Sequence, residues 1–163
     1  MFLVLEMGDE AYNAAKTVWK IYGLLFKQLI HQYGEEKALQ LHQKTFREHG
    51  EGTAEWLRSQ VGDDANLEEL GEILLGSLEA TGFESNMVVE SPNSVVVNNT
   101  KCPRYDGFKM AGLSDELVGK YCTMGGKNAI GRQLQLLDPK LGFGLRTFKP
   151  WEGLCEEHFY RTE

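Results

Sequence analysis

Apolar residues recur along the first half of the chain with the period of an α-helix. Over residues 9–33, aromatic and aliphatic residues return at spacings of three and four, which predicts one helix with a continuous apolar stripe. The stripe comprises Tyr12, Ala15, Trp19, Tyr22, Phe26, Leu29 and Tyr33. Asp9 is the expected N-cap, and Gly34 is the expected residue after the last turn. The apolar residues 1–5 are expected to form a short strand or an ordered arm.

Three further helices are predicted from the same period, at residues 35–49, 53–61 and 66–82, with a loop at residues 62–65. Gly50 is expected to end the first of them. Asn66 and Glu69 have the spacing of a capping box at the start of the third, and Gly82 is expected to end it. The sequence thus predicts a helical layer over about residues 9–82.

The apolar period then changes from about 3.6 to two, which is typical of strands. Residues 86–90 and 94–98 are β-branched runs separated by turn-forming residues, and they predict a hairpin. A helix over residues 114–137 separates it from a second hairpin, at residues 143–148 and 154–161. The second half, about residues 85–161, is therefore a β-β-α-β-β unit with an antiparallel sheet. Residues 1–163 are expected to form a single α+β domain.

Composition and charge narrow the function classes. The 163 residues carry a formal net charge of −7, with a pI of about 5.2, which argues against a nucleic-acid partner bound through its phosphates. No apolar run approaches the roughly 20 residues of a membrane span, so no membrane partner is expected. The N-terminus lacks the features of a signal peptide, which favours a cytoplasmic location. Three cysteines are an odd number, and this argues against a disulfide framework.

All three cysteines, Cys102, Cys122 and Cys155, lie in the last third of the chain. Their separations of 20 and 33 residues match no compact zinc motif, so only the fold can bring them together. Three interpretations stay open: a site for zinc or another transition metal formed by the three thiols, a single nucleophilic cysteine, or buried inert thiols. On an ideal strand, Glu157 shares a face with Cys155, whereas His158 points the other way. Glu157 is therefore a candidate co-ligand or general base.

Cationic and aromatic residues supply candidate ligand contacts. Lys101 and Arg104 flank Cys102, and positive neighbours favour the thiolate, so Cys102 is the preferred nucleophile. Arg104 and Arg146 are candidates to hold a carboxylate of a small-molecule ligand or substrate. Trp19 and Tyr22 either pack in the core, pair two chains in a homodimer, or line a ligand cavity.

The last 65 residues or so also resemble a known family. The residues that carry the resemblance are Cys102-Pro103, Gly112-Leu113, Tyr121-Cys122, Arg146-Thr147, Gly153-Leu154-Cys155 and Phe159. This pattern resembles the L-2-amino-thiazoline-4-carboxylic acid hydrolase family. The same stretch is similar to the V4R domain, a small-molecule-binding module, in its order of elements and in its ending at residues 153–159. Zinc-binding V4R members carry a Glu and a further Cys on the penultimate strand, and residues 143–148 contain neither.

The resemblance implies a hydrolase that opens a cyclic C–N bond of a small sulfur-containing heterocycle. Its candidate catalytic residues are Cys102, Cys122, Cys155 and Glu157, with Arg146 holding the substrate carboxylate. The alternative is a non-catalytic sensor or carrier that binds a small ligand in the same pocket. A third class is a structural dimerising module without a pocket.

Overall fold

The structure is a computed structural model that describes residues 2–62 and 66–162, with side chains described from Asp9 onward. Its helices are α1 (Phe2–Tyr33), α2 (Glu35–Val61), α3 (Leu67–Glu79), α4 (Pro103–Met110) and α5 (Asp115–Leu137), with a 3₁₀ turn η1 (Pro150–Glu152). Its strands are β1 (Glu84–Ser91), β2 (Ser94–Lys101), β3 (Leu141–Lys149) and β4 (Leu154–Arg161). Of the predicted loop at residues 62–65, residues 63–65 lie outside the described part. Among the described helices, none is both long and apolar enough to cross a bilayer.

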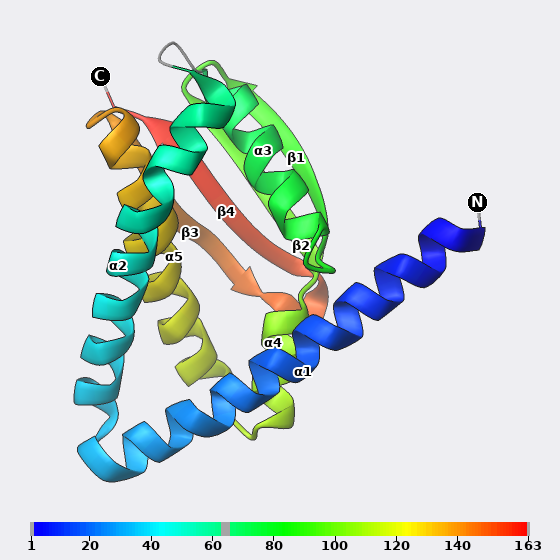
Figure 1. Cartoon of the computed structure of the whole chain (residues 1–163), viewed down its shortest axis with the longest axis vertical. Helices are drawn as coiled ribbons and strands as arrows, with labels where there is room; N and C mark the ends of the chain where they lie inside the picture. Colours follow the sequence, from blue (N-terminus) through cyan, green and yellow to red (C-terminus); the bar gives the residue numbers. More distant parts are fainter. Residues whose placement is uncertain (1, 63–65, 163) are drawn as a thin grey trace.

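The two predicted hairpins form one antiparallel sheet in the order β1-β2-β4-β3. They join through β2 and β4, where Val97 lies opposite Glu157 and Val95 opposite Phe159. Helix α3 packs on the β1-β2 side and α5 packs on β3, while α1 crosses the lower end beside α4 (Figure 1). The predicted α+β class, with a helical layer followed by a β-β-α-β-β sheet unit, is confirmed.

Two apolar clusters make up the core. The first lies between the sheet, α3 and the second half of α5, and includes Leu70, Val97, Leu134 and Phe159. The second lies between α1, α4 and the first half of α5, and includes Phe26, Phe108 and Tyr121. The aromatic stripe of α1 therefore packs mainly inside one chain. Trp19, for example, makes an edge contact with Phe108 at 5.5 Å between ring centroids.

Helix α1 differs from the prediction at its start. It begins at Phe2, so the expectation of a strand or arm at residues 1–5 is wrong for the described residues 2–5, and Asp9 is an interior helical residue and no N-cap. Leu, Met and Glu favour helices, and each added residue of a formed helix gains one hydrogen bond. The helix ends as predicted at Gly34, whose φ of 81° is in the left-handed region.

Helix α2 runs unbroken through Gly50, which corrects the prediction of two helices at residues 35–49 and 53–61. Gly50 allows a close helix contact: a Cβ there would lie 2.4 Å from the carbonyl oxygen of Ala129 on α5. The glycine thus permits α2 and α5 to touch through their backbones. From the sequence alone, this role cannot be distinguished from that of a helix terminator.

Helix α4 was not among the elements predicted from the sequence. Pro103 stands at its first position, which suits proline because the missing N–H has no helical partner there. Cys102 is the N-cap, and its Sγ accepts a hydrogen bond from the backbone N–H of Tyr105 at 3.3 Å. The predicted Asn66–Glu69 capping box at the start of α3 is confirmed. Ser114, where the helix over residues 114–137 was predicted to start, is the N-cap of α5.

The contact at Gly50 gives a testable difference between two glycines of the same helix. Gly50→Ala should lower the free energy of unfolding by about 1–3 kcal/mol, because the new methyl group overpacks against Ala129. Gly52→Ala is the matched control: no atom of the described residues lies within 4 Å of its Cβ position, and alanine should raise stability by about 1 kcal/mol. Urea unfolding followed by circular dichroism measures both, and equal effects would contradict the close contact.

Candidate functional site

Five side chains from three elements meet inside the protein, and we call them the buried polar cluster. Cys102 and Arg104 come from the start of α4, Cys122 from α5, and Cys155 and Glu157 from β4. Burial raises the pKa of each of the three thiols and of the Glu157 carboxyl, and the guanidinium of Arg104 opposes each of these shifts. Each of the three cysteines and Glu157 thus lies within the range of the Arg104 charge.

The alternation of β4 places two members of this cluster. Cys155, Glu157 and Phe159 are buried on the face that α3 and α5 cover, whereas His158 lies on the opposite face. The pairing of Cys155 with Glu157 therefore follows from strand geometry, as the sequence predicted. The same geometry keeps His158 away from the thiols.

Burial controls the ionisation of the cluster. It raises the pKa of Cys102 to about 12, and it raises the pKa values of Cys122 and Cys155 as well, with Arg104 opposing the shift in each case. Burial also raises the pKa of Glu157, again against the influence of Arg104. The desolvation of each anion outweighs the attraction of one guanidinium, so near neutral pH the thiols are protonated.

Burial therefore disfavours the reactive thiolate expected at Cys102, and that expectation stays a prediction. Lys101, expected to activate it, directs its ammonium to Glu84 at 2.9 Å and to Asp9 at 3.6 Å. Arg104 does act on the thiol, but its effect is smaller than the cost of burying a thiolate. A cation that is adjacent in sequence raises thiolate content only if its charge also faces the sulfur.

The described residues do not form a set of side chains that could bind a metal ion. Within residues 2–62 and 66–162, no three His, Cys, Asp or Glu side chains lie close enough to hold a metal ion. Cys102, Cys122 and Cys155 thus share a neighbourhood without forming a coordination shell.

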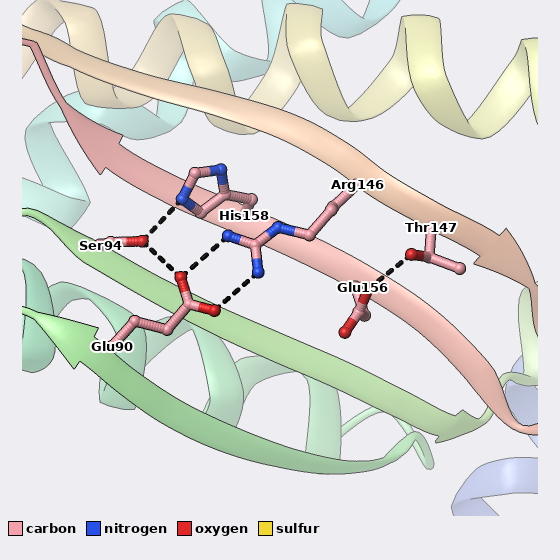
Figure 2. Close-up of polar contacts among 6 residues, drawn as sticks. All are labelled: Glu90, Ser94, Arg146, Thr147, Glu156 and His158. Atoms are coloured by element: carbon pink, nitrogen blue, oxygen red, sulfur yellow. Dashed lines mark hydrogen bonds and ion pairs between the residues drawn. The ribbon is translucent and has the colours of Figure 1, made fainter.

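Arg146, expected to bind a substrate carboxylate beside the cysteines, lies on the other face of the sheet. There its guanidinium makes a bidentate ion pair with Glu90, at 2.7 and 2.9 Å (Figure 2). Ser94 donates to Glu90 at 2.8 Å and lies 2.9 Å from Nε2 of His158. Strand alternation puts Arg146 on this face, because the neighbouring Leu145 pairs with the buried Glu157 on the inner face. Glu90 therefore already supplies the carboxylate that Arg146 was expected to take from a substrate.

A cavity of about 430 Å³ opens beside the buried polar cluster, between α2, α5 and α1. Its lining comprises Trp19, Thr45, Phe46, His49, Arg104, Gly125, Gly126, Ala129, Ile130 and Gln133. The guanidinium carbon of Arg104 lies 4.9 Å from the centre of the Trp19 ring, in a cation–π contact. Trp19 is thus a wall of the cavity, as one prediction held. Tyr22 is not part of this lining and packs 5.8 Å from the Tyr121 ring.

A second cavity of about 230 Å³ adjoins the first, and both are lined by His49, Ile130 and Gln133. The second cavity reaches α3 and is also lined by Glu157. Arg104 and Glu157 therefore border neighbouring parts of one hollow region along α2 and α5.

Several buried polar atoms at this region have no hydrogen-bond partner among the described residues. They are Nε of Arg104, the hydroxyl of Tyr121, Oε2 of Glu157 and Nδ1 of His42. Buried polar atoms in folded proteins are rarely left unpaired, because each costs about 1–3 kcal/mol. His42 has an evident structural role: its Nε2 lies 3.1 Å from the Tyr121 carbonyl, and burial lowers its pKa to about 4. For Arg104 and Glu157, the adjoining cavities leave room for a partner from outside the chain.

Sequence reasoning missed much of the cavity wall. Nothing in the local sequence pattern distinguishes Phe46, His49 or Gln133 from other residues of their helices, although all three line the cavity. The adjacent glycines Gly125 and Gly126 were the available signal, because a glycine pair inside a helix marks a place where another group comes close. A Cβ on Gly126 would lie 2.5 Å from the Phe143 ring.

No family model, curated protein or solved structure matches the chain. Membership of the amino-thiazoline-carboxylate hydrolase family, and the likeness to V4R domains, therefore stay predictions from the residues that carry them.

The protonated state of Cys102 can be tested by alkylation. At about pH 8, iodoacetamide should modify Cys102 about a thousandfold more slowly in native than in urea-unfolded protein, because a pKa of about 12 against 9.0 leaves far less thiolate. The native rate should keep rising as the pH passes 9. Peptide mass spectrometry gives the rate for each cysteine, and a Cys102 rate that levels off near neutral pH would restore the nucleophile.

Proposed function

We propose that the chain is a small-molecule-binding domain that holds an apolar ligand bearing a carboxylate, or a similar single anionic group, against Arg104. The observation that carries this proposal is a buried guanidinium, with its Nε unpaired among the described residues, at the wall of a cavity of about 430 Å³. Arginine suits this role because its planar fork matches a carboxylate.

The charge balance around Arg104 supports an anionic ligand. The ionisable groups that act on Arg104 include Cys122, Cys102 and Glu157, and burial raises the pKa of each, which favours their neutral forms. Arg104 makes no ion pair with the side chains of residues 9–62 and 66–162. A buried cation without a counter-ion is costly, so an entering anion gains affinity by supplying one.

The apolar walls support a ligand with a hydrophobic body. Trp19, Phe46, Ala129 and Ile130 line most of the cavity, and aromatic and aliphatic walls suit planar or branched apolar groups. The adjoining cavity extends the site past Gln133 to Glu157. Oε2 of Glu157 has no hydrogen-bond partner among the described residues, so a longer ligand gains a second polar contact there.

The hydrolase activity stays a prediction. A cysteine nucleophile requires a thiolate, and burial favours the protonated thiol at all three cysteines. This observation favours the binding domain over the enzyme. All three cysteines are free, and we place the domain in the cytoplasm, where thiols stay reduced.

The test compares matched pairs of ligands. A panel of aromatic and branched aliphatic carboxylates is titrated against their uncharged amides by isothermal calorimetry. The wild type should prefer carboxylates by about 10- to 100-fold, the effect of one charge-assisted contact. Arg104→Gln should lose this preference, whereas Arg104→Lys should keep part of it.

Arg146→Gln is the control, because it removes an arginine on the other face of the sheet. It should leave carboxylate binding unchanged. Equal binding of acids and amides by the wild type, or an Arg104→Gln variant that stays folded and still prefers acids, would overturn the proposal.

We also propose that two copies pair through α1, as a second candidate that a separate observation favours. Val18, Ile21 and Leu25 stand at spacings of three and four, and are 63%, 63% and 54% exposed. This row lies outside the aromatic stripe that packs inside the chain. Helix α1 also extends away from the rest of the molecule at its N-terminal end (Figure 1). A second copy offers the same row, which suits a two-fold contact with coiled-coil spacing.

The dimer is tested by placing a charge in this row. Ile21→Glu should weaken self-association at least about 100-fold, because it buries an unpaired carboxylate in the contact. Val88→Glu is the matched control, since Val88 is 53% exposed on β1, away from α1. Sedimentation velocity at tens of micromolar measures both variants. A monomeric wild type, or equal effects of the two variants, would contradict pairing through α1.

A further inference from the structure

A small basic pocket lies between α2 and α5, separate from the ligand cavity. It has a volume of about 190 Å³ and is lined by Arg47, Lys127, Asn128, Arg132 and Gln135. We call it the basic pocket. The only residues that line it are cationic or carry an amide, although the whole chain has a net charge of −7. Such a local reversal of charge in a concave site is a feature that attracts anions.

One carboxylate holds the two arginines of the basic pocket in place. Oε1 of Glu51 accepts hydrogen bonds from Nε of Arg47 at 3.2 Å and from Nε of Arg132 at 2.9 Å. Both bonds use the Nε atoms, and the terminal Nη groups of both arginines have no hydrogen-bond partner within residues 9–62 and 66–162. Glu51 therefore orders two guanidinium groups and leaves their terminal donors free.

The remaining lining groups add charge and hydrogen-bonding capacity. Lys127 makes no ion pair with any side chain in the described part of the protein. Asn128 is fixed by a hydrogen bond from its Nδ2 to the Met124 carbonyl at 2.7 Å. The three cations of the basic pocket, together with the Glu51 carboxylate that binds the two arginines, carry a formal charge of +2. This charge matches a phosphate dianion better than a monocarboxylate.

We infer that the basic pocket binds a phosphoryl group, either as inorganic phosphate or as the monoester of a small molecule. Two guanidinium groups offer the forked donors that phosphate oxygens accept, and Lys127 adds a point charge. Helix spacing explains the assembly: Arg47 and Glu51 are four residues apart on α2, and Asn128 and Arg132 are four apart on α5. The Gly50–Ala129 contact brings these two faces together.

The test titrates the full chain with inorganic phosphate, phenyl phosphate and sulfate, at constant ionic strength set with sodium chloride. Isothermal calorimetry gives the affinities, and ¹⁵N–¹H spectra report the arginine Nε signals. We expect saturable phosphate binding that tightens from about pH 5.5 to 7.5, as phosphate becomes a dianion. Lys127→Gln should weaken it about tenfold, and Arg132→Gln about tenfold or more.

Lys37→Gln is the matched control, because Lys37 is an exposed lysine of α2 that does not line the basic pocket. It removes the same charge and should change the affinity less than about twofold. Lys127→Gln breaks no ion pair among the described residues, so it tests the site even if Arg132→Gln unfolds the chain. Equal affinity for inorganic phosphate and phenyl phosphate supports free phosphate as the ligand, and tighter phenyl phosphate binding supports a monoester.

Three outcomes would overturn the inference: phosphate binding no stronger than that of chloride, equal losses in Lys127→Gln and Lys37→Gln, or unchanged affinity in a folded Arg132→Gln variant. The test is independent of the proposed ligand cavity, because Arg104 does not line the basic pocket. Arg104→Gln should lose carboxylate preference and keep phosphate binding, so the failure of one proposal is distinguishable from the failure of the other.

Discussion

The backbone contact between α2 and α5 at Gly50 is the constraint on which both candidate sites depend. Since a Cβ there would lie 2.4 Å from the Ala129 carbonyl oxygen, only glycine lets the two helices approach this closely. On one side of the contact, His49, Ile130 and Gln133 line the two adjoining cavities. On the other side, Arg132 reaches across to Glu51 and completes the basic pocket. A wider spacing between α2 and α5 would change the shape of the ligand cavities and of the basic pocket.

The second organising feature is the buried guanidinium of Arg104. A charge removed from water needs compensation, and here part of it comes from the Trp19 and Phe83 rings, at 4.9 and 5.4 Å. The thiols supply little negative charge, because burial favours their protonated forms, and burial also raises the pKa of Glu157. The site is therefore electrostatically incomplete in a way that an anionic ligand would correct. The same burial that makes Arg104 effective for binding makes the cysteines poor nucleophiles, and this links the two functional alternatives to one physical cause.

The two faces of the sheet show how an arginine's surroundings decide its role. Arg146 and Glu90 neutralise each other on one face, with Ser94 and His158 joined to the same network (Figure 2). Arg104 lies behind the other face, beside a cavity and without such a partner in the described part of the chain. In the sequence, Arg104 and Arg146 were equal candidates for binding the carboxylate of a ligand. Only the presence or absence of an internal counter-ion separates them.

Local patterns in the sequence determined most of the secondary structure. Apolar periods of 3.6 and two, the capping box at Asn66 and the turn-forming residues 91–93 predicted seven of the elements and the α+β class, because these signals act over a few neighbouring residues. The seven are α1, α3, α5 and the four strands. The shared face of Cys155 and Glu157 also followed, since strand alternation is local. Helix α4 and the unbroken α2 did not follow, because Pro103 and Gly50 are compatible with more than one local conformation.

Tertiary structure alone decided the chemistry of the site. Whether Gly50 ends a helix or touches Ala129, whether Arg146 faces the cysteines or Glu90, and which sign the pKa shift of Cys102 takes all depend on groups far away in the sequence. Burial and electrostatic pairing are properties of the assembled fold. A sequence can therefore name the residues able to do chemistry, whereas the packing around them determines their charge, their partners and their access to a ligand.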